Sequence, residues 1–446
     1  MSGQLVVVVA VFAAVVLAIA FDLIDLAVAA MMGVVAFTVI GAVTAHDVVA
    51  AVESGGGTIA LLFGGMVVAR VLTPTGFFGL VGNRLLAFSG GSGRRLMLGM
   101  ALLVTPLCAV LPNATVVLLL APVVVGACRA LDVDFVPPLI VLATISNASG
   151  LLTLVGDPAT YLVGSAIHLS FGEYLRRVSL GGVLAILVVV ALMPWLARAA
   201  WTTRRGAAPP AAPMEIKNKG FAAAALLILA LMALLFVFGD RLPVSQGAPG
   251  VAILAATLAL LAIYHWRIEP VEKVLSDVDW RTLIFIFCML LMVQALVKTG
   301  ALSAVTTMMH AAFGTNLPAV AIALLAGVAI LSSALANTPV VMALLIVVKG
   351  YFVVIESVPE EAMGAAFDAW PAASLPVFVA MMFGATLGGN ATLIGATANI
   401  VAAGISAREG RPISFGRFLR IGGPIAAAQI AVSAVYVTGL WMVTRP

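Results

Sequence analysis

Long runs of apolar residues recur along the whole chain and constrain its fold more than any other feature. They cover, for example, residues 5–21, 26–44, 178–196, 221–238 and 251–264. A helix needs about 20 largely apolar residues to cross a bilayer. Hydrophobic residues make up 63% of the sequence and charged residues only 9%, against roughly 45–50% and about 25% in a soluble domain. A water-soluble fold is therefore excluded, and the alternating strand segments of about ten residues that cross outer membranes are absent.

A polar, proline-containing segment at residues 201–219 divides the chain into two halves of similar size. In each half we expect three spans, a surface helix, a hairpin, an interrupted span and a last span. In the first repeat (1–200) we expect these at about 4–21, 26–44, 57–73, 76–90, 97–130, 136–166 and 178–198. In the second repeat (220–446) we expect them at about 220–238, 247–265, 281–297, 301–313, 317–356, 372–406 and 420–443.

Each hairpin is predicted from a polar tip between two apolar stretches that are short for a full crossing. The tips read LPNAT at 111–115 and LANTP at 335–339. Irregular backbone is tolerated at membrane depth only where protein or a watery cavity covers it. We therefore interpret both segments as re-entrant hairpins that do not cross the membrane.

The interrupted spans give the clearest repeat signal. Residues 153–164 (TLVGDPATYLVG) align without a gap with residues 392–403 (TLIGATANIVAA). Small polar residues and glycines also precede both, as SNASG at 146–150 and GGNA at 388–391. Matching interruptions in two halves are typical of a transporter site near the middle of the bilayer. The fold class that follows is an all-α polytopic membrane protein with two inverted repeats, each of five spans and one re-entrant hairpin, with one broken helix per repeat.

The residues expected at the centre of the membrane are almost all neutral. For substrate or ion binding we select Asn113, Thr115, Asn147, Ser149, Thr153, Asn337, Thr338, Asn390, Thr392 and Asn399. Helix N-termini at the breaks favour anions or neutral oxygen-rich solutes, and the amide and hydroxyl oxygens could also hold Na⁺. The same side chains can instead serve as hydrogen-bonding contacts between helices.

Asp157 is the one acid that the sequence places in mid-span. It precedes Pro158, so one role open to it is to cap a new helix segment. The other role is proton coupling, because burial away from water disfavours the charged carboxylate. The second repeat has Ala396 at the aligned position, so we expect proton coupling to depend on the first repeat.

Cofactor chemistry has no support in the sequence. The three cysteines and four histidines are scattered and have no metal-binding spacing. No phosphate-binding loop is present, so ATP-driven transport would need a separate subunit. We expect a transporter and not an enzyme, without a cofactor other than a transported H⁺ or a bound Na⁺.

The basic residues predict an orientation in the membrane. With the linker in the cytoplasm, six of the 23 basic residues fall on the opposite side, namely Arg176, Arg177, Arg241, Lys298, Lys349 and Arg445. This asymmetry fits the positive-inside rule. We expect a multi-pass protein of a bacterial-type inner membrane, with the linker cytoplasmic and both termini periplasmic.

At the two broken-helix motifs the chain resembles the ion transporter superfamily, which contains arsenite permeases, the pink-eyed-dilution protein, one type of Na⁺/H⁺ antiporter and the divalent-anion/sodium symporters. Residues 153–164 are similar to the first broken-helix motif of this superfamily, and residues 388–404 followed by 413–423 look closest to its arsenite permease and pink-eyed-dilution branch. In the symporters each tip carries Ser-Asn-Thr, and the tips here keep Asn113, Asn337 and Thr338 but neither serine. The resemblance implies Na⁺ or substrate binding at these three residues.

The resemblance leads to three functional hypotheses. The first is a proton-coupled arsenite/antimonite efflux permease with elevator-like alternating access, working alone or with a cytosolic ATPase subunit. The second is a Na⁺- or H⁺-coupled anion or carboxylate transporter, and the third is a Na⁺/H⁺ antiporter. The expected partners are a small inorganic or anionic solute, the lipid bilayer and a second copy in a homodimer, but no nucleic acid.

Overall fold

The described part of the chain is built almost entirely from helices. The computed structural model describes residues 3–20, 23–204, 216, 218–239, 247–300, 303–335, 337–363 and 367–445. Within these ranges the only β-type pairing is an isolated bridge between Ser92 and Arg204. Nine of the described helices are long and apolar enough to cross a membrane. The expected all-α membrane fold is therefore confirmed, while most of the expected linker lies outside the described residues.

The helices of the two halves follow each other in a similar order. The first half contains α1 (Gly3–Ala20), α2 (Leu26–Val39), α3 (Ala45–Leu72), η1 (Thr73–Thr75), α4 (Phe77–Ser89), α5 (Gly93–Cys108), α6 (Asn113–Ala130), α7 (Val136–Ser149), η2 (Gly150–Leu152), α8 (Pro158–Ala166), α9 (Phe171–Arg177), α10 (Ser179–Leu196) and α11 (Arg198–Thr202). The second half contains α12 (Lys219–Phe238), α13 (Gly247–His265), α14 (Val271–Ser276), α15 (Trp280–Lys298), α16 (Ser303–Phe313), α17 (Leu317–Ala334), α18 (Asn337–Val354), η4 (Glu360–Met363), η5 (Ala372–Ser374), α19 (Leu375–Gly388), η6 (Gly389–Ala391), α20 (Thr397–Arg408) and α21 (Phe415–Thr444).

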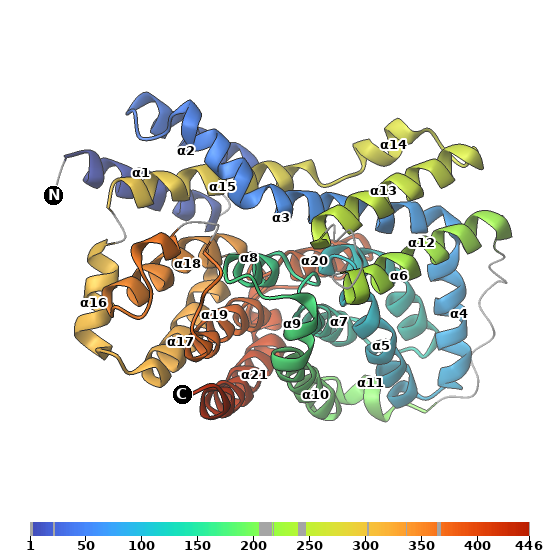
Figure 1. The fold of residues 1–446 in the computed structure, drawn as a ribbon. Helices are drawn as coiled ribbons and strands as arrows, with labels where there is room; N and C mark the ends of the chain where they lie inside the picture. Colours follow the sequence, from blue (N-terminus) through green and yellow to red (C-terminus); the bar gives the residue numbers. More distant parts are fainter. Residues whose placement is uncertain are drawn as a thin grey trace.

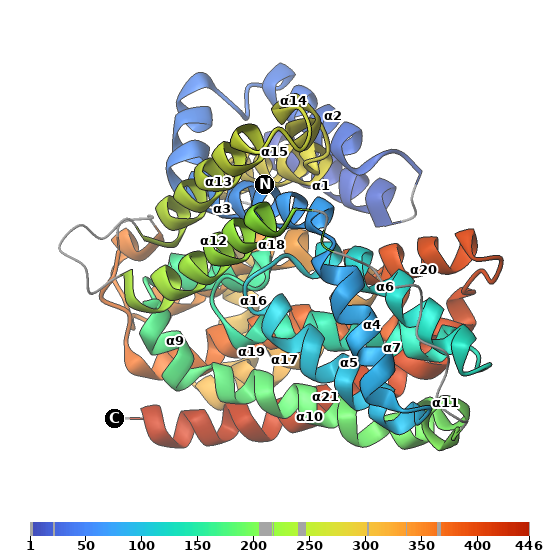
Figure 2. The same cartoon turned by 90° about the vertical axis from the view of Figure 1, so that its right-hand side faces the viewer.

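These helices form two layers, which Figure 1 shows from the side. The upper one, which we call the scaffold layer, consists of α1–α3 and α12–α15; in it α3 packs on α13, and α15 packs on α2 and α3. The lower one, the hairpin layer, consists of α5–α8, α10 and α17–α21. In it α17 packs on α19, α6 on α20, and α10 on α21, and the last pair forms the lower edge in Figure 2.

Helix α3 is longer than the apolar pattern predicts, because polar residues start it early. It begins at Ala45, whereas the span was expected from about residue 57. Asp47 accepts hydrogen bonds from the backbone nitrogen of Thr44 at 2.7 Å and from its hydroxyl at 2.6 Å. This capping box satisfies N–H groups at the start of the helix, so α3 gains more than two turns before its apolar part.

Both interrupted spans break in the same way, at a close crossing of two glycine backbones. A Cβ atom added to Gly156 would lie 2.6 Å from the carbonyl oxygen of Gly150, and one added to Gly395 would lie 2.6 Å from that of Gly389. Real Cβ atoms do not approach backbone so closely, so both crossings require glycine. The chain can therefore leave α7 and α19 through the short helices η2 and η6, turn, and start α8 and α20 soon after them.

Each broken helix is also tied to the hairpin of its own half by one hydroxyl group. The Thr153 hydroxyl donates to the carbonyl oxygen of Ala109 at 2.5 Å, and the Thr392 hydroxyl donates to that of Ser333 at 2.5 Å. The acceptors lie at the ends of α5 and α17, directly before the two hairpin tips. The same contact thus recurs in both halves, while their opposite orientation in the membrane stays a prediction.

Candidate functional site

The hairpin tips and the broken helices meet at a cavity of about 280 Å³. The hairpin layer contributes the N-terminal ends of α6, α8, α18 and α20, and the scaffold layer contributes α3 and the start of α15. The polar and charged side chains in its lining are Arg70, Thr73, Asn113, Thr115, Asn147, Asp157, Asp277, Asp279, Thr282, Asn337, Thr338 and Thr397. Six of the eleven residues predicted for the site therefore line one cavity.

Asp157 lies at the point where the two halves meet, and only 2% of its surface is exposed. One carboxylate oxygen accepts from the backbone nitrogen of Ala159 at 2.8 Å, so it caps α8 as expected. The other oxygen accepts from the Asn337 amide at 3.1 Å and from the Thr386 hydroxyl at 3.4 Å. The carboxylate of the first half is thus completed by donors from the second half.

The two hairpin asparagines have different surroundings. Asn337 donates to Asp157, and its own oxygen accepts from the backbone nitrogen of Thr338 at 2.8 Å. Asn113 lies at the tip of the first hairpin, and its buried amide oxygen has no hydrogen-bond partner among the described residues. A buried acceptor without a donor is costly, so a donor group of a solute that reached this oxygen would be bound favourably.

Five of the predicted site residues lie behind the cavity wall. Thr153 and Thr392 bond to the hairpin carbonyl groups described above, and the Ser149 hydroxyl lies 3.5 Å from that of Thr105. Asn390 and Asn399 both accept from the Asn147 amide, at 2.9 and 3.1 Å. The structure therefore gives these five side chains contacts between helices, which the sequence had left open as an alternative.

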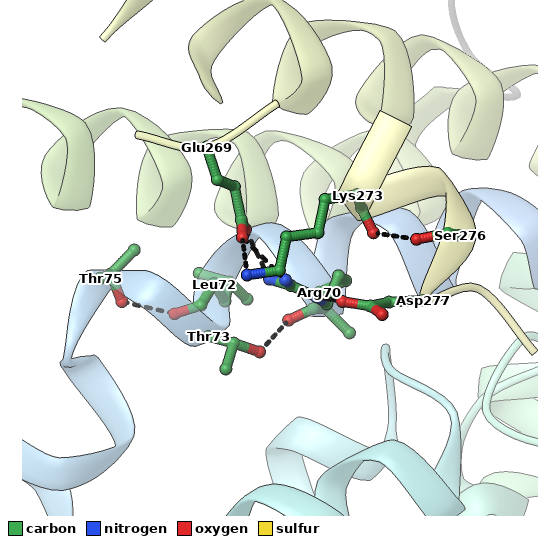
Figure 3. A network of polar contacts seen from close by, with 9 residues as sticks. Arg70, Leu72, Thr73, Thr75, Glu269, Lys273, Ser276 and Asp277 are labelled. Carbon is green, nitrogen blue, oxygen red and sulfur yellow. Dashed lines mark hydrogen bonds and ion pairs between the residues drawn. The ribbon is translucent and has the colours of Figure 1, made fainter. Parts of the chain in front are cut away.

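Sequence reasoning did not select the charged residues at the mouth of the cavity. Figure 3 shows Arg70 of α3 between Glu269 and Asp277. Its guanidinium group donates to the two Glu269 oxygens at 2.7 and 3.0 Å and to Asp277 at 2.8 Å. Arg70 is the one basic residue in the described lining of this cavity, and its charge is already paired. No local pattern could reveal these contacts, because the partners lie about 200 residues away in the sequence.

A second cavity of about 520 Å³ lies between the layers and shares the four helices α3, α8, α15 and α18 with the first. Helix α8 contributes Asp157 and Pro158 at its start to the first cavity and Tyr161 further along to the second. Helix α18 similarly reaches from the first cavity to Lys349, which is 5% exposed and lies 5.6 Å from the Trp370 ring. The sequence had assigned Lys349 to the side of the membrane opposite the linker, which stays a prediction; in the structure it lies within α18.

Two interrupted helices and two hairpin tips around one cavity define a multi-pass membrane transporter, and not an enzyme. A family model described as "CitMHS: Citrate transporter" matches residues 15–374, and the chain belongs to this family of secondary transporters. The predicted membership of the ion transporter superfamily is thereby confirmed.

Similar proteins support the assignment to membrane transporters. An uncharacterized transporter of Synechocystis is 45% identical, over 86% of this chain and 86% of the relative. An uncharacterized transporter of Mycobacterium tuberculosis is 31% identical, over 86% and 85%. The P protein of Mus musculus is 26% identical, over 85% of this chain and 53% of its own length. Among solved structures, the YdaH transporter of Alcanivorax borkumensis shares the fold, with a TM-score of 0.55, 14% identity, and 88% and 87% coverage.

Proposed function

We propose that the chain is a proton-coupled transporter that exports a small, neutral, hydroxyl-rich solute of the arsenite type. The observation that carries this proposal is the chemistry of the first cavity: amide and hydroxyl groups surround one buried carboxylate, and the basic side chain of the described lining, Arg70, is paired with two acids. A multiply charged anion would meet Asp157 without a free cation to balance it. An uncharged solute avoids this repulsion.

Asp157 is the proposed proton carrier. Its carboxylate touches the cavity, and it binds elements of both halves, through Ala159 of α8 and Asn337 of α18. A change in its charge therefore alters the contact between the first broken helix and the second hairpin. Protonation can in this way be linked to movement as well as to solute binding.

The two cavities support an alternating-access movement of the elevator type. Both lie where the scaffold layer meets the hairpin layer, and both use α3, α8, α15 and α18. Sliding of the hairpin layer against the scaffold would bring the tips from one cavity toward the other. The contacts of Thr153 and Thr392 hold each broken helix to its hairpin, so we expect these parts to move together.

A carboxylate transporter is the second candidate, for two reasons. The family model carries the description of a citrate transporter. In addition, the N-termini of α6 and α20 at the cavity have no side-chain cap, and their free N–H groups favour an anion.

Both candidates can be tested in everted membrane vesicles. The vesicles are prepared from an arsenite-sensitive bacterial strain that expresses the protein. We expect uptake of arsenite that increases with an acid vesicle interior and needs no Na⁺. Citrate uptake without arsenite uptake would replace the first candidate by the second. Na⁺-dependent proton movement without either solute would favour the antiporter, and vesicles identical to the empty-vector control would reject all three.

A further inference from the structure

A chain of four buried amide groups runs from the cavity wall to the far side of the hairpin layer. Asn147 of α7, Asn390 of η6, Asn399 of α20 and Gln429 of α21 are each 0–3% exposed. Only Asn147 lines the cavity. The Asn147 nitrogen donates to the oxygens of Asn390 (2.9 Å) and Asn399 (3.1 Å), and the Asn390 nitrogen donates to the oxygen of Gln429 (2.8 Å).

Backbone carbonyl groups at the ends of this series of four amides determine which way each side-chain amide places its nitrogen and its oxygen. The Gln429 nitrogen donates to the carbonyl oxygen of Ala185 at 3.0 Å. Since a backbone carbonyl can only accept, Gln429 must turn its own oxygen to Asn390, and Asn390 must then turn its oxygen to Asn147.

The hydrogen bonds of Asn399 independently indicate the same orientation of Asn147. The Asn399 nitrogen donates to two backbone carbonyl oxygens, those of Gly389 and Thr392, both at 2.8 Å. Both of its protons are then used, so its oxygen must face Asn147. Asn147 thus meets acceptors on two sides, and both of its amide protons point away from the cavity.

We propose that Asn147 is a specificity-determining residue that offers only its side-chain carbonyl oxygen to the transported solute. Three positioning residues keep its amide group in this orientation, namely Asn390, Asn399 and Gln429. The unpartnered Asn113 oxygen and the Asp157 carboxylate add two further acceptors to the same cavity. Three acceptor groups select a solute that carries hydrogen-bond donors, such as the O–H groups of arsenous acid or of a protonated carboxylic acid. This inference rests on the proposed function and deepens it.

The orientation of Asn147 can be tested without any transport. We compare Asn147→Asp with Asn147→Leu by the thermal unfolding of the purified protein in detergent between pH 8 and pH 5, each relative to wild type at the same pH. Ionised aspartate would place oxygen against two acceptor oxygens, whereas the protonated form regains one O–H donor. We therefore expect a Tm deficit that shrinks on acidification for Asn147→Asp and stays constant for Asn147→Leu.

The comparison with wild type at each pH removes the contribution of the charged groups that line the same cavity, namely Arg70, Asp157, Asp277 and Asp279. An Asn147→Asp variant as stable as wild type at pH 8 would overturn the proposal, because the inner side of the residue would then not need a donor.

The positioning role is tested at Gln429, which does not touch the cavity. Gln429→Leu leaves the Asn390 nitrogen with only its 3.4 Å hydrogen bond to the carbonyl oxygen of Thr144 and so loosens this amide. We therefore expect the KM for arsenite in everted vesicles to rise about threefold to tenfold, the scale of one neutral hydrogen bond, at unchanged Vmax. Ser433→Ala, one turn further along α21, is the matched control. An unchanged KM in Gln429→Leu would refute the positioning role. Vesicles in which wild type carries no arsenite would refute the proposed function alone, and the unfolding experiment would still judge the orientation of Asn147.

Discussion

Replacing Asp157 with asparagine removes the carboxylate but keeps most of its contacts. An asparagine oxygen can still accept from the Ala159 nitrogen, and asparagine caps helices about as well as aspartate. The new amide nitrogen would face the Asn337 nitrogen, which now donates to Asp157 at 3.1 Å. The hydrogen bond from Asn337 is therefore lost, the Thr386 hydroxyl must turn from donor to acceptor, and the cap of α8 remains.

The loss of stability should be small. A hydrogen bond to a charged group contributes about 1.5–3 kcal/mol. Asn337 lines the cavity, where its nitrogen can bind water, and the variant no longer buries a charge, which is itself unfavourable. We therefore expect Asp157→Asn to lower the stability by about 1 kcal/mol or less. Asp25→Asn is a matched control, because Asp25 also caps a helix, α2, but lies in the scaffold layer.

Two transport measurements in proteoliposomes separate binding from coupling. Counterflow exchange without a pH gradient requires only binding and movement of the site, so we expect Asp157→Asn to retain it. Uptake driven by a pH gradient requires a titrating group, so we expect the variant to lose the stimulation that wild type and Asp25→Asn show. Full stimulation by the gradient in Asp157→Asn would refute the role of this carboxylate as the proton carrier.

Four further substitutions test the fold by thermal unfolding in detergent. Gly156→Ala places a Cβ atom 2.6 Å from a backbone oxygen and should cost about 2–3 kcal/mol, whereas Gly404→Ala in open space within α20 should stabilise by about 0.5–1 kcal/mol. Arg70→Lys loses the bidentate contact with Glu269. The free energy of unfolding should fall by about 1–2 kcal/mol, because lysine is a point charge. At Asp47, burial raises the pKa, but hydrogen bonds at the start of α3 and the ion pair with Lys298 outweigh it and lower the pKa from 3.8 to about 2. Its stabilisation is complete above pH 3.8 and is lost as the pH falls through about 2, so Asp47→Asn should be less stable than wild type at pH 7, with a gap that closes in acid; a gap independent of pH would contradict this.

The positions of the helices were largely readable from the sequence, because each is dictated by a local pattern. Apolar runs marked the spans, and the polar tips marked both hairpins, which turn before Asn113 and Asn337. The glycines at the breaks predicted where α7 and α19 end. Helix α2 ends and α21 begins several residues from the expected bounds, and α3 begins furthest from its expected start, because a capping box and not hydrophobicity sets where this helix starts.

The partners within the site were less predictable, because they join distant parts of the chain. The sequence assigned proton coupling to the first repeat but did not reveal the side-chain partners of Asp157, which are Asn337 and Thr386 of the other half. The hydroxyls of Thr153 and Thr392 matched the polar pattern of a binding site equally well, but they face hairpin backbone. Composition can identify polar residues at membrane depth, but only the packing of the helices decides which of them face the cavity.

A single carboxylate between the two halves also limits the thermodynamics of transport. If Asp157 carries the proton, each cycle can exchange at most one proton for one solute. For an uncharged solute, one pH unit across the membrane can then sustain at most about a tenfold concentration ratio, and each further 59 mV of membrane potential adds about another factor of ten. Because the second half has Ala396 at the position aligned with Asp157, the free energy stored in the solute gradient can reach that of one proton crossing the membrane, and no multiple of it.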